Sequence, residues 1–174
     1  RLMMTVLPMV VLVAALVLFR HKFTLSDDHA AEISAQLHGK KEGVWIRYGK
    51  GGKPEKSTTY KNDEKNGEEI TYFTDGTPEK SSNYLNGKLN GVTKEFYFES
   101  GKCKSEYTFK NGKREGAYKR YFDTGKLREE GRCEADSEVY RKEYYANGKL
   151  KSVAERKGGG WNTIERYDSE GNKE

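Results

Sequence analysis

The chain is poor in the residues that most catalytic sites require. It contains two cysteines and three histidines among 174 residues, and His21, His29 and His38 all precede residue 40. A Ser-His-Asp or Cys-His arrangement in the rest of the chain would have to reach back to that segment. The CxxC, HExxH and GxxxxGK patterns are also absent. We therefore predict a protein that is not an enzyme, with no catalytic residue, metal, cofactor or small-molecule substrate.

Aliphatic side chains are scarce after residue 40, where a two-layer β-sandwich would need alternating Val, Ile and Leu on its inner faces. An excess of one charge is missing as well, because 32 basic residues stand against 27 acidic ones and the net charge of +5 is spread along the chain. A nucleic-acid-binding surface would need a basic stripe on one side, with aromatic residues between the charges. We therefore predict no nucleic-acid partner, and we expect aromatic residues to supply most of the burial.

The chain does contain a regular repeat, in which a tyrosine precedes a glycine by four residues. Successive glycines of this pattern are 24, 25, 24, 23 and 23 residues apart, a spacing typical of a repeat array. The pairs are Tyr48/Gly52, Tyr72/Gly76, Tyr97/Gly101, Tyr121/Gly125, Tyr144/Gly148 and Tyr167/Gly171. Arrays of this kind usually bind other molecules rather than catalyse reactions.

Each repeat carries two turn signals. One is the glycine of the pairs above, and the other is Asn86-Gly87 or Asn111-Gly112, with Asn62-Asp63 at the matching place in the first repeat. Asn-Gly and Asp-Gly between short runs indicate type I′ hairpins, since both central residues need positive φ. The pattern predicts an all-β fold, an elongated antiparallel β-meander of about six two-stranded repeats over residues 42–174. The predicted turn glycines are Gly52, Gly76, Gly87, Gly101, Gly112, Gly125, Gly148 and Gly171.

The aromatic residues fall into rows with the period of the repeat. The rows are expected either to form the core of a thin sheet or to leave one aromatic face open for a partner, because exposed apolar patches mark interaction sites. The predicted partner-binding residues are Tyr48, Tyr72, Tyr97, Tyr121 and Tyr144 in one row, and Phe73, Phe98, Phe122 and Tyr145 in a row of opposite parity on the other face. A further row contains Tyr60, Tyr84 and Phe109 and continues to Cys133 and Arg156.

Tyr-Phe-Thr-Asp-Gly at 72–76, Tyr-Leu-Asn-Gly-Lys-Leu-Asn-Gly at 84–91 and Tyr-Tyr-Ala-Asn-Gly-Lys-Leu at 144–150 resemble the MORN-repeat variant of bacterial proteins. Many such proteins are classed as antitoxin or immunity components, and the same repeat also serves as a scaffold and a membrane-associated platform. The resemblance implies no catalytic residues. The chain departs from the pattern after Gly131 and again at residues 157–160, where we expect longer and looser connections and a terminal capping unit.

Cys103 and Cys133 fall on the second strands of adjacent repeats, with the same strand parity. Two strand spacings and six residues of rise separate them by about 20 Å. A disulfide requires Cα atoms within about 7 Å of each other. We therefore predict that both cysteines are unpaired.

The only long hydrophobic run is at the N-terminus, where residues 2–19 carry no charge and Arg20 and Lys22 follow. Eighteen residues of helix span about 27 Å, just enough to cross a bilayer core. We predict a retained transmembrane helix, the alternative being a signal segment. A linker at 20–41 with a short helix would connect this anchor to the repeats. Positive charge after the run favours a cytoplasmic repeat domain, but the plan of an anchor followed by a polar domain favours an extracytoplasmic, periplasmic one, which we prefer.

These observations predict a single-pass membrane protein whose repeats bind other proteins, as an accessory or scaffold subunit of a membrane complex. An antitoxin or immunity protein that neutralises a toxin is the first alternative. A repeat protein that binds a carbohydrate or a lipid surface is the second.

Overall fold

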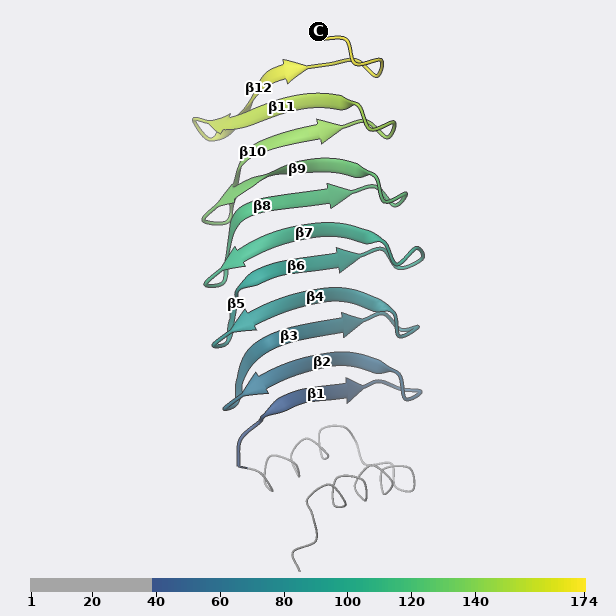
Figure 1. Ribbon diagram of the computed structural model, residues 1–174, viewed down its shortest axis with the longest axis vertical. Helices are drawn as coiled ribbons and strands as arrows, with labels where there is room; N and C mark the ends of the chain where they lie inside the picture. Colours follow the sequence, from purple (N-terminus) through teal and green to yellow (C-terminus); the bar gives the residue numbers. More distant parts are fainter. Residues whose placement is uncertain (1–38) are drawn as a thin grey trace, which may run out of the picture. The chain divides into compact units, whose positions relative to one another are not determined.

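The computed structural model describes residues 39–174 (Figure 1). The predicted transmembrane helix at 2–19, its flanking Arg20 and Lys22, and the short linker helix lie outside the described residues. From Lys40 to Glu174 the chain forms one compact unit. No helix in this part of the chain has the length and apolar character needed to cross a membrane.

The described residues form one antiparallel sheet in which the strands follow one another in chain order. Only the short β5 lies off the path, pairing with β4, so the predicted β-meander is confirmed. Figure 1 shows the strands stacked as rungs, with turns alternating between the two side edges of the sheet. The strands are β1 (Gly43–Tyr48), β2 (Pro54–Lys61), β3 (Glu64–Tyr72), β4 (Pro78–Leu85), β5 (Lys88–Leu89), β6 (Gly91–Phe96), β7 (Cys103–Lys110), β8 (Lys113–Tyr121), β9 (Leu127–Glu134), β10 (Ser137–Tyr144), β11 (Leu150–Lys157) and β12 (Gly160–Arg166).

One side edge of the sheet carries two-residue turns with positive φ, as predicted. Asn86 and Gly87 have φ of 49° and 75°, and Asn111 and Gly112 repeat this pair with 52° and 85°, which suits a type I′ turn. The expectation of a longer, looser connection after Gly131 is wrong, because the turn that follows is equally short. It is formed by Ala135 and Asp136, with φ of 46° and 70°. The glycines at 158 and 159 likewise make a tight turn between β11 and β12.

The opposite side edge carries longer turns of a different type from the one predicted. In the turn after β3, the Phe73 amide donates to the Thr77 carbonyl at 2.8 Å, and the Gly76 amide donates to the Phe73 carbonyl at 2.9 Å. Gly76 has φ of 92°, whereas Asp75 is not in the positive-φ region. This arrangement is a type I turn followed by a left-handed glycine, so one positive φ suffices where type I′ needs two.

The other predicted glycines of this edge lie in the turns as expected, and each has positive φ. The values are 75° at Gly52, 63° at Gly101, 88° at Gly125, 92° at Gly148 and 91° at Gly171. Each glycine amide donates back to a carbonyl at the start of its own turn, at 2.8–3.2 Å. The prediction of a type I′ turn is therefore wrong at Asn147-Gly148, as it is at Asp75-Gly76, because these turns close over more than two residues. Among these five turns, only that of Gly52 also has positive φ at the preceding residue, which is another glycine.

The turn after β6 is one residue longer than its equivalents, and this changes the tyrosine row. Tyr97 donates its amide to the Lys102 carbonyl at 2.9 Å, as Phe73 does to Thr77 in the turn after β3. Phe96 pairs with Cys103 as Tyr72 pairs with Pro78. The prediction that Tyr97 belongs to the Tyr72 row is therefore wrong. The prediction counts four residues back from the turn glycine, and the extra residue of this turn lies before that glycine.

Contacts between successive turns bind each repeat to the next. On the short-turn edge, the Gly87 amide donates to the Lys65 carbonyl at 2.9 Å, one repeat earlier. On the long-turn edge, Lys102 Nζ donates to the Thr124 carbonyl at 2.9 Å, and Lys126 Nζ repeats this contact with the next turn. Hydrogen bonds therefore connect successive repeats along both side edges of the sheet, in addition to the pairing of the strands.

The register of the strands assigns every side chain to one of two faces. One row of paired residues runs across the sheet through Thr58, Glu69, Ser82, Tyr107 and Tyr118, and we term its side the network face. The other side, which we term the tyrosine face, carries Tyr48, Tyr72, Phe96, Tyr121 and Tyr144. Apart from Val153, the buried residues lie on the network face.

The row of Tyr60, Tyr84, Phe109 and Cys133 also lies on the network face, opposite glycines with positive φ. Tyr84 pairs with Gly67, which has φ of 123°, and a Cβ there would lie 3.0 Å from the Thr59 side chain. Gly67 and Gly116 sit where the strand register shifts, so they admit bulges that L-residues resist. Cys133 is buried in this row.

Both cysteines are free, as predicted. The prediction that they share strand parity is wrong, however. Cys103 pairs with Phe96 on the tyrosine face, whereas Cys133 lies on the network face. The register shift beside Phe96 reverses the parity that the sequence spacing suggests.

Candidate interaction surface

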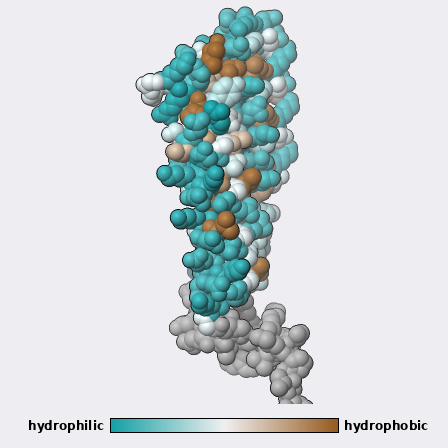
Figure 2. Space-filling view, turned by 60° about the vertical axis from the view of Figure 1, so that its left-hand side comes forward, coloured by the Kyte–Doolittle hydropathy of each residue, from teal (hydrophilic) through white to brown (hydrophobic). Residues whose placement is uncertain are grey.

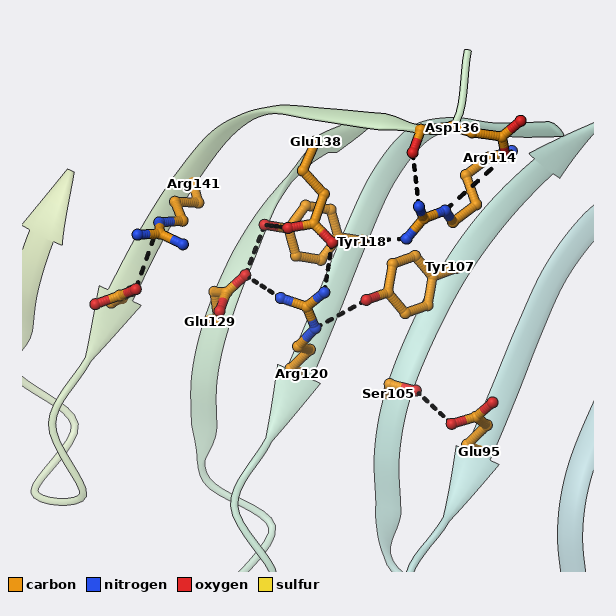
Figure 3. A network of polar contacts seen from close by, with 11 residues as sticks. Glu95, Ser105, Tyr107, Arg114, Tyr118, Arg120, Glu129, Asp136, Glu138 and Arg141 are labelled. Carbon is orange, nitrogen blue, oxygen red and sulfur yellow. Dashed lines mark hydrogen bonds and ion pairs between the residues drawn. The ribbon is translucent and has the colours of Figure 1, made fainter. Parts of the chain in front are cut away.

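The centre of the network face is an ion-pair cluster built on β8, β9 and β10 (Figure 3). Arg120 extends one guanidinium nitrogen to Glu129 and another to Glu138, each at 2.5 Å. The Tyr118 hydroxyl donates to Glu129 Oε1 at 2.6 Å. Arg114 adds a contact of 3.6 Å with Glu138. Two cations thus neutralise two carboxylates that the sheet largely buries.

Two aromatic rings line this cluster. Tyr107 and Tyr118 stack with their centroids 5.4 Å apart. The Arg120 guanidinium lies 4.9 Å from the Tyr118 ring and donates through Nε to the Tyr107 hydroxyl at 2.8 Å. Cation–π and hydrogen-bond contacts together hold the arginine in one position.

The surroundings of Tyr118 and Arg120 raise the pKa values of both groups. Burial raises the pKa of Tyr118, and its hydrogen bond to Glu129 raises it further. Burial opposes the charge on Arg120, but Glu129, Tyr107 and Glu138 outweigh it and raise the pKa of the guanidinium above its ordinary value. Neither Tyr118 nor Arg120 therefore changes protonation near neutral pH.

A smaller cluster surrounds Glu69 on β3. Lys65 Nζ lies 2.6 Å and Lys56 Nζ 3.3 Å from the same carboxylate oxygen, to which Thr58 also donates at 3.1 Å. Burial acts to raise the pKa of Glu69, but the hydrogen bond from Lys65 and the charge of Lys56 lower it below its ordinary value. Within residues 39–174, no group of His, Cys, Asp and Glu is arranged to hold a metal.

The sequence-predicted tyrosines lie half-buried on the tyrosine face, with several of their hydroxyls engaged. Tyr144 donates to Glu130 at 2.7 Å, and Tyr72 lies 3.4 Å from the Ser57 hydroxyl. Burial raises the pKa of Tyr144 to about 12, with help from its bond to Glu130. Except for Tyr97, the predicted row is therefore in register and on one side of the sheet.

The second predicted row lies in the long turns, not on the opposite face. Phe73, Phe122 and Tyr145 each begin a turn, where strand parity no longer sets the direction of a side chain. Phe73 and Phe98 meet edge to face, with centroids 5.0 Å apart. The Tyr145 hydroxyl donates to the Tyr167 carbonyl at 2.8 Å, one repeat further on. These aromatics join neighbouring turns.

Four of the exposed large apolar side chains lie on the tyrosine face, and sequence reasoning missed them. Val44 on β1 is 65% exposed, Leu85 on β4 50% and Val92 on β6 40%, and Ile46 joins them on β1. In the view of Figure 2, hydrophobic residues form separate spots on a mainly hydrophilic surface. Further along the same face, a shallow open pocket of about 410 Å³ lies between β8 and β11, lined by Tyr140 and charges of both signs.

The repeat architecture matches a known family. The model of the MORN repeat variant matches five stretches that together span most of the chain, at residues 41–62, 65–86, 89–111, 114–132 and 138–157. The chain belongs to the MORN repeat variant family. Each MORN repeat corresponds to one hairpin of the structure, from β1–β2 to β10–β11, and β12 follows as an unmatched strand. No curated protein matches the chain.

Proposed function

We propose that this MORN repeat protein is a non-catalytic scaffold that binds another protein through its tyrosine face. MORN repeats generally mediate interactions with proteins or lipids. The observation that carries the proposal is the open single-layer sheet, in which Val44, Leu85 and Val92 stay exposed on one side while the other side is filled by its own ion pairs. Tyrosines are enriched at protein interfaces, and exposed apolar residues on the same face add surface that a partner can cover.

We also propose that residues 2–19 anchor the scaffold in a membrane, with Arg20 and Lys22 at the interface and the repeats on the extracytoplasmic side. In this arrangement the array would be an accessory subunit of a membrane complex. The support is the uncharged run of eighteen residues followed by basic ones.

The test is purification of the full chain from native membranes in mild detergent, followed by mass spectrometry and native sizing. Leu85→Lys with Val92→Lys changes only the exposed tyrosine face, and Lys56→Ala with Lys80→Ala is a matched change on the network face. We expect a membrane protein to be recovered stoichiometrically with wild type and the network-face variant, and lost with the tyrosine-face variant. Equal recovery with both variants would contradict the assignment of the face.

The same experiment separates the alternatives. Recovery of a single small toxin-like protein would favour an antitoxin or immunity function. Binding of isolated cell-wall material or of lipid vesicles, lost in the tyrosine-face variant, would favour a carbohydrate- or lipid-surface-binding protein.

A further inference from the structure

The first strand presents an unusual edge. Within residues 39–174, β1 has a single strand neighbour, β2. Its run Val44-Trp45-Ile46 has high β-propensity, and Val44 and Ile46 remain 65% and 43% exposed. Exposed apolar edge strands pair with further strands unless charges, proline or a covering segment blunt them.

The other end of the array is blunted in this way. The chain turns back after β12, where Tyr167 forms a bridge with Lys173 and the Glu174 amide donates to the Arg166 carbonyl at 2.9 Å. Lys173 also lies 3.3 Å from Glu165. The C-terminal residues therefore occupy part of the β12 edge, and the two ends of the sheet are not equivalent.

The directions of the strands determine which strand of a second copy can form an antiparallel pair with β1. Successive strands along the path from β1 to β12 are antiparallel, and the path contains an even number of steps, so β1 and β12 run in the same direction. Head-to-tail addition of a second copy would require a parallel pair. Pairing of β1 with β1 of a second copy about a two-fold axis gives an antiparallel pair, which is more stable per residue and closes after two chains.

The side chains of β1 select the register. A two-fold axis perpendicular to the sheet places residues of the same face opposite each other. One residue of β1 must therefore lie opposite its own copy, and the axis passes between the two. Centring it at Ile46 pairs Ile46 with its own copy on the tyrosine face, and places Trp45 opposite Arg47 on the network face, where a cation–π contact can form. Centring it at Arg47 would oppose two guanidiniums, and centring it at Val44 would oppose Lys41 to Arg47. Centring it at Trp45 would place Gly43 opposite Arg47 and so lose the contact between Arg47 and the indole.

We propose that two copies of this chain form a symmetric dimer through β1, centred at Ile46. The register shift beside Tyr48 does not prevent this pairing. The extra residue of the shift, Glu55, belongs to β2, so the outer side of β1 remains regular. The two sheets then join into one, with both tyrosine faces on the same side, so that a bivalent partner is bound with higher avidity than by one copy.

Cysteine crosslinking of the full chain in mild detergent tests the register. Directly opposed residues of an antiparallel pair have Cα atoms about 4.5–5.5 Å apart, within the range of a disulfide. The Ile46→Cys variant should therefore form a disulfide between the two introduced thiols of neighbouring copies, identified by mass spectrometry. Val92→Cys, which is exposed on the same face but remote from the edge, is the control and should not crosslink.

Sedimentation velocity of the same preparation tests the dimer without crosslinking. We expect dimer formation that rises with concentration. Ile46→Lys should weaken it by at least about tenfold in Kd, whereas Val92→Lys should leave it unchanged. A protein that stays monomeric at all concentrations would overturn the proposal. So would an Ile46→Cys thiol that neither crosslinks nor reacts with maleimide, since another segment of the same chain would then cover β1.

Discussion

At the scale of single residues, Arg120 holds together two carboxylates that would otherwise repel each other in a largely buried position. Removing one member of such an ion-pair cluster lowers the stability by more than the intact cluster adds to it, because the remaining charges stay buried without a partner. We expect Arg120→Met to lower the free energy of unfolding by about 3 kcal/mol, measured by urea denaturation.

The control is Arg132→Met, which removes an exposed arginine lying 3.1 Å from Glu134. Exposed pairs contribute about 0–1 kcal/mol, so this variant should unfold close to wild type. Equal losses in both variants would show that Glu129 and Glu138 do not depend on Arg120 for compensation.

A second prediction at this scale concerns glycines. Gly131 does not have positive φ, yet a Cβ there would lie 2.1 Å from the Tyr140 carbonyl and 2.7 Å from the Tyr118 ring. We expect Gly131→Ala to destabilise by about 3 kcal/mol or more through overpacking. Gly160→Ala, with open space around it, should change the melting temperature little. A mild effect at residue 131 would show that β9 and β10 do not pack this closely.

A third prediction at this scale concerns the buried hydroxyl of Thr93. It has no hydrogen-bond partner among the described residues and lies on the network face between strands. An unsatisfied buried polar group costs about 1–3 kcal/mol. Thr93→Val keeps the shape and removes the hydroxyl, so it should raise the unfolding free energy by about 1 kcal/mol. A loss of stability instead would mean that the hydroxyl is solvated.

Strand parity within one strand could be read from the sequence, and partners across strands could not. Adjacent residues of a strand face opposite ways, and Glu68 and Glu69 accordingly lie on the tyrosine and network faces. The cluster around Arg120 joins residues 9 and 18 positions away. Its formation depends on the shift of register between β9 and β10, and no local pattern marks that shift.

At the scale of elements, turn geometry determines where every strand begins. Ala135 adopts φ of 46° in a turn whose equivalents use asparagine, such as Asn62 and Asn111. Alanine resists this conformation, whereas asparagine accepts it. We expect Ala135→Asn to stabilise the protein by about 0.5–1 kcal/mol, measured by thermal unfolding. Ala146→Asn, in a turn without positive φ at that position, is the control and should have little effect.

The turn glycines could be located from the sequence, but the types and lengths of their turns could not. A period counted from glycines such as Gly101 placed Tyr97 in the row that Phe96 occupies, because the extra residue of that turn is visible only through its hydrogen bonds. Likewise, Ala135 and Asp136 make a type I′-like turn without an Asn-Gly signal. In this turn the pairing of β9 with β10 overrides the local preference.

At the scale of the whole molecule, pH should limit stability from both sides. The folded-state pKa of Tyr144 is raised by burial and by Glu130 from 10.0 to about 12, so its contribution is complete below pH 10 and is lost between pH 10 and 12. Burial opposes the charge of Glu69, but Lys65 and Lys56 outweigh it and lower the pKa of Glu69 below 4.5. The contribution of Glu69 is therefore complete above pH 4.5 and is lost as pH falls below that.

Urea denaturation across this range should show a plateau at neutral pH with a decline at each end. Tyr144→Phe should flatten the alkaline decline, and Glu69→Gln the acid one. If the alkaline decline is unchanged in Tyr144→Phe, the Tyr144 hydroxyl is not the group that titrates there.

The whole array is an open sheet with one face filled by its own side chains and the other partly exposed, and the proposed partner-binding function rests on that asymmetry. Site-specific photo-crosslinking in native membranes tests it most directly, with a photoreactive residue at Val92 on the tyrosine face or at Lys80 on the network face, whose side chain is 43% exposed. We expect an adduct with another protein from position 92 and none from position 80. Adducts from position 80 alone, or from neither position in a folded protein, would contradict the assignment.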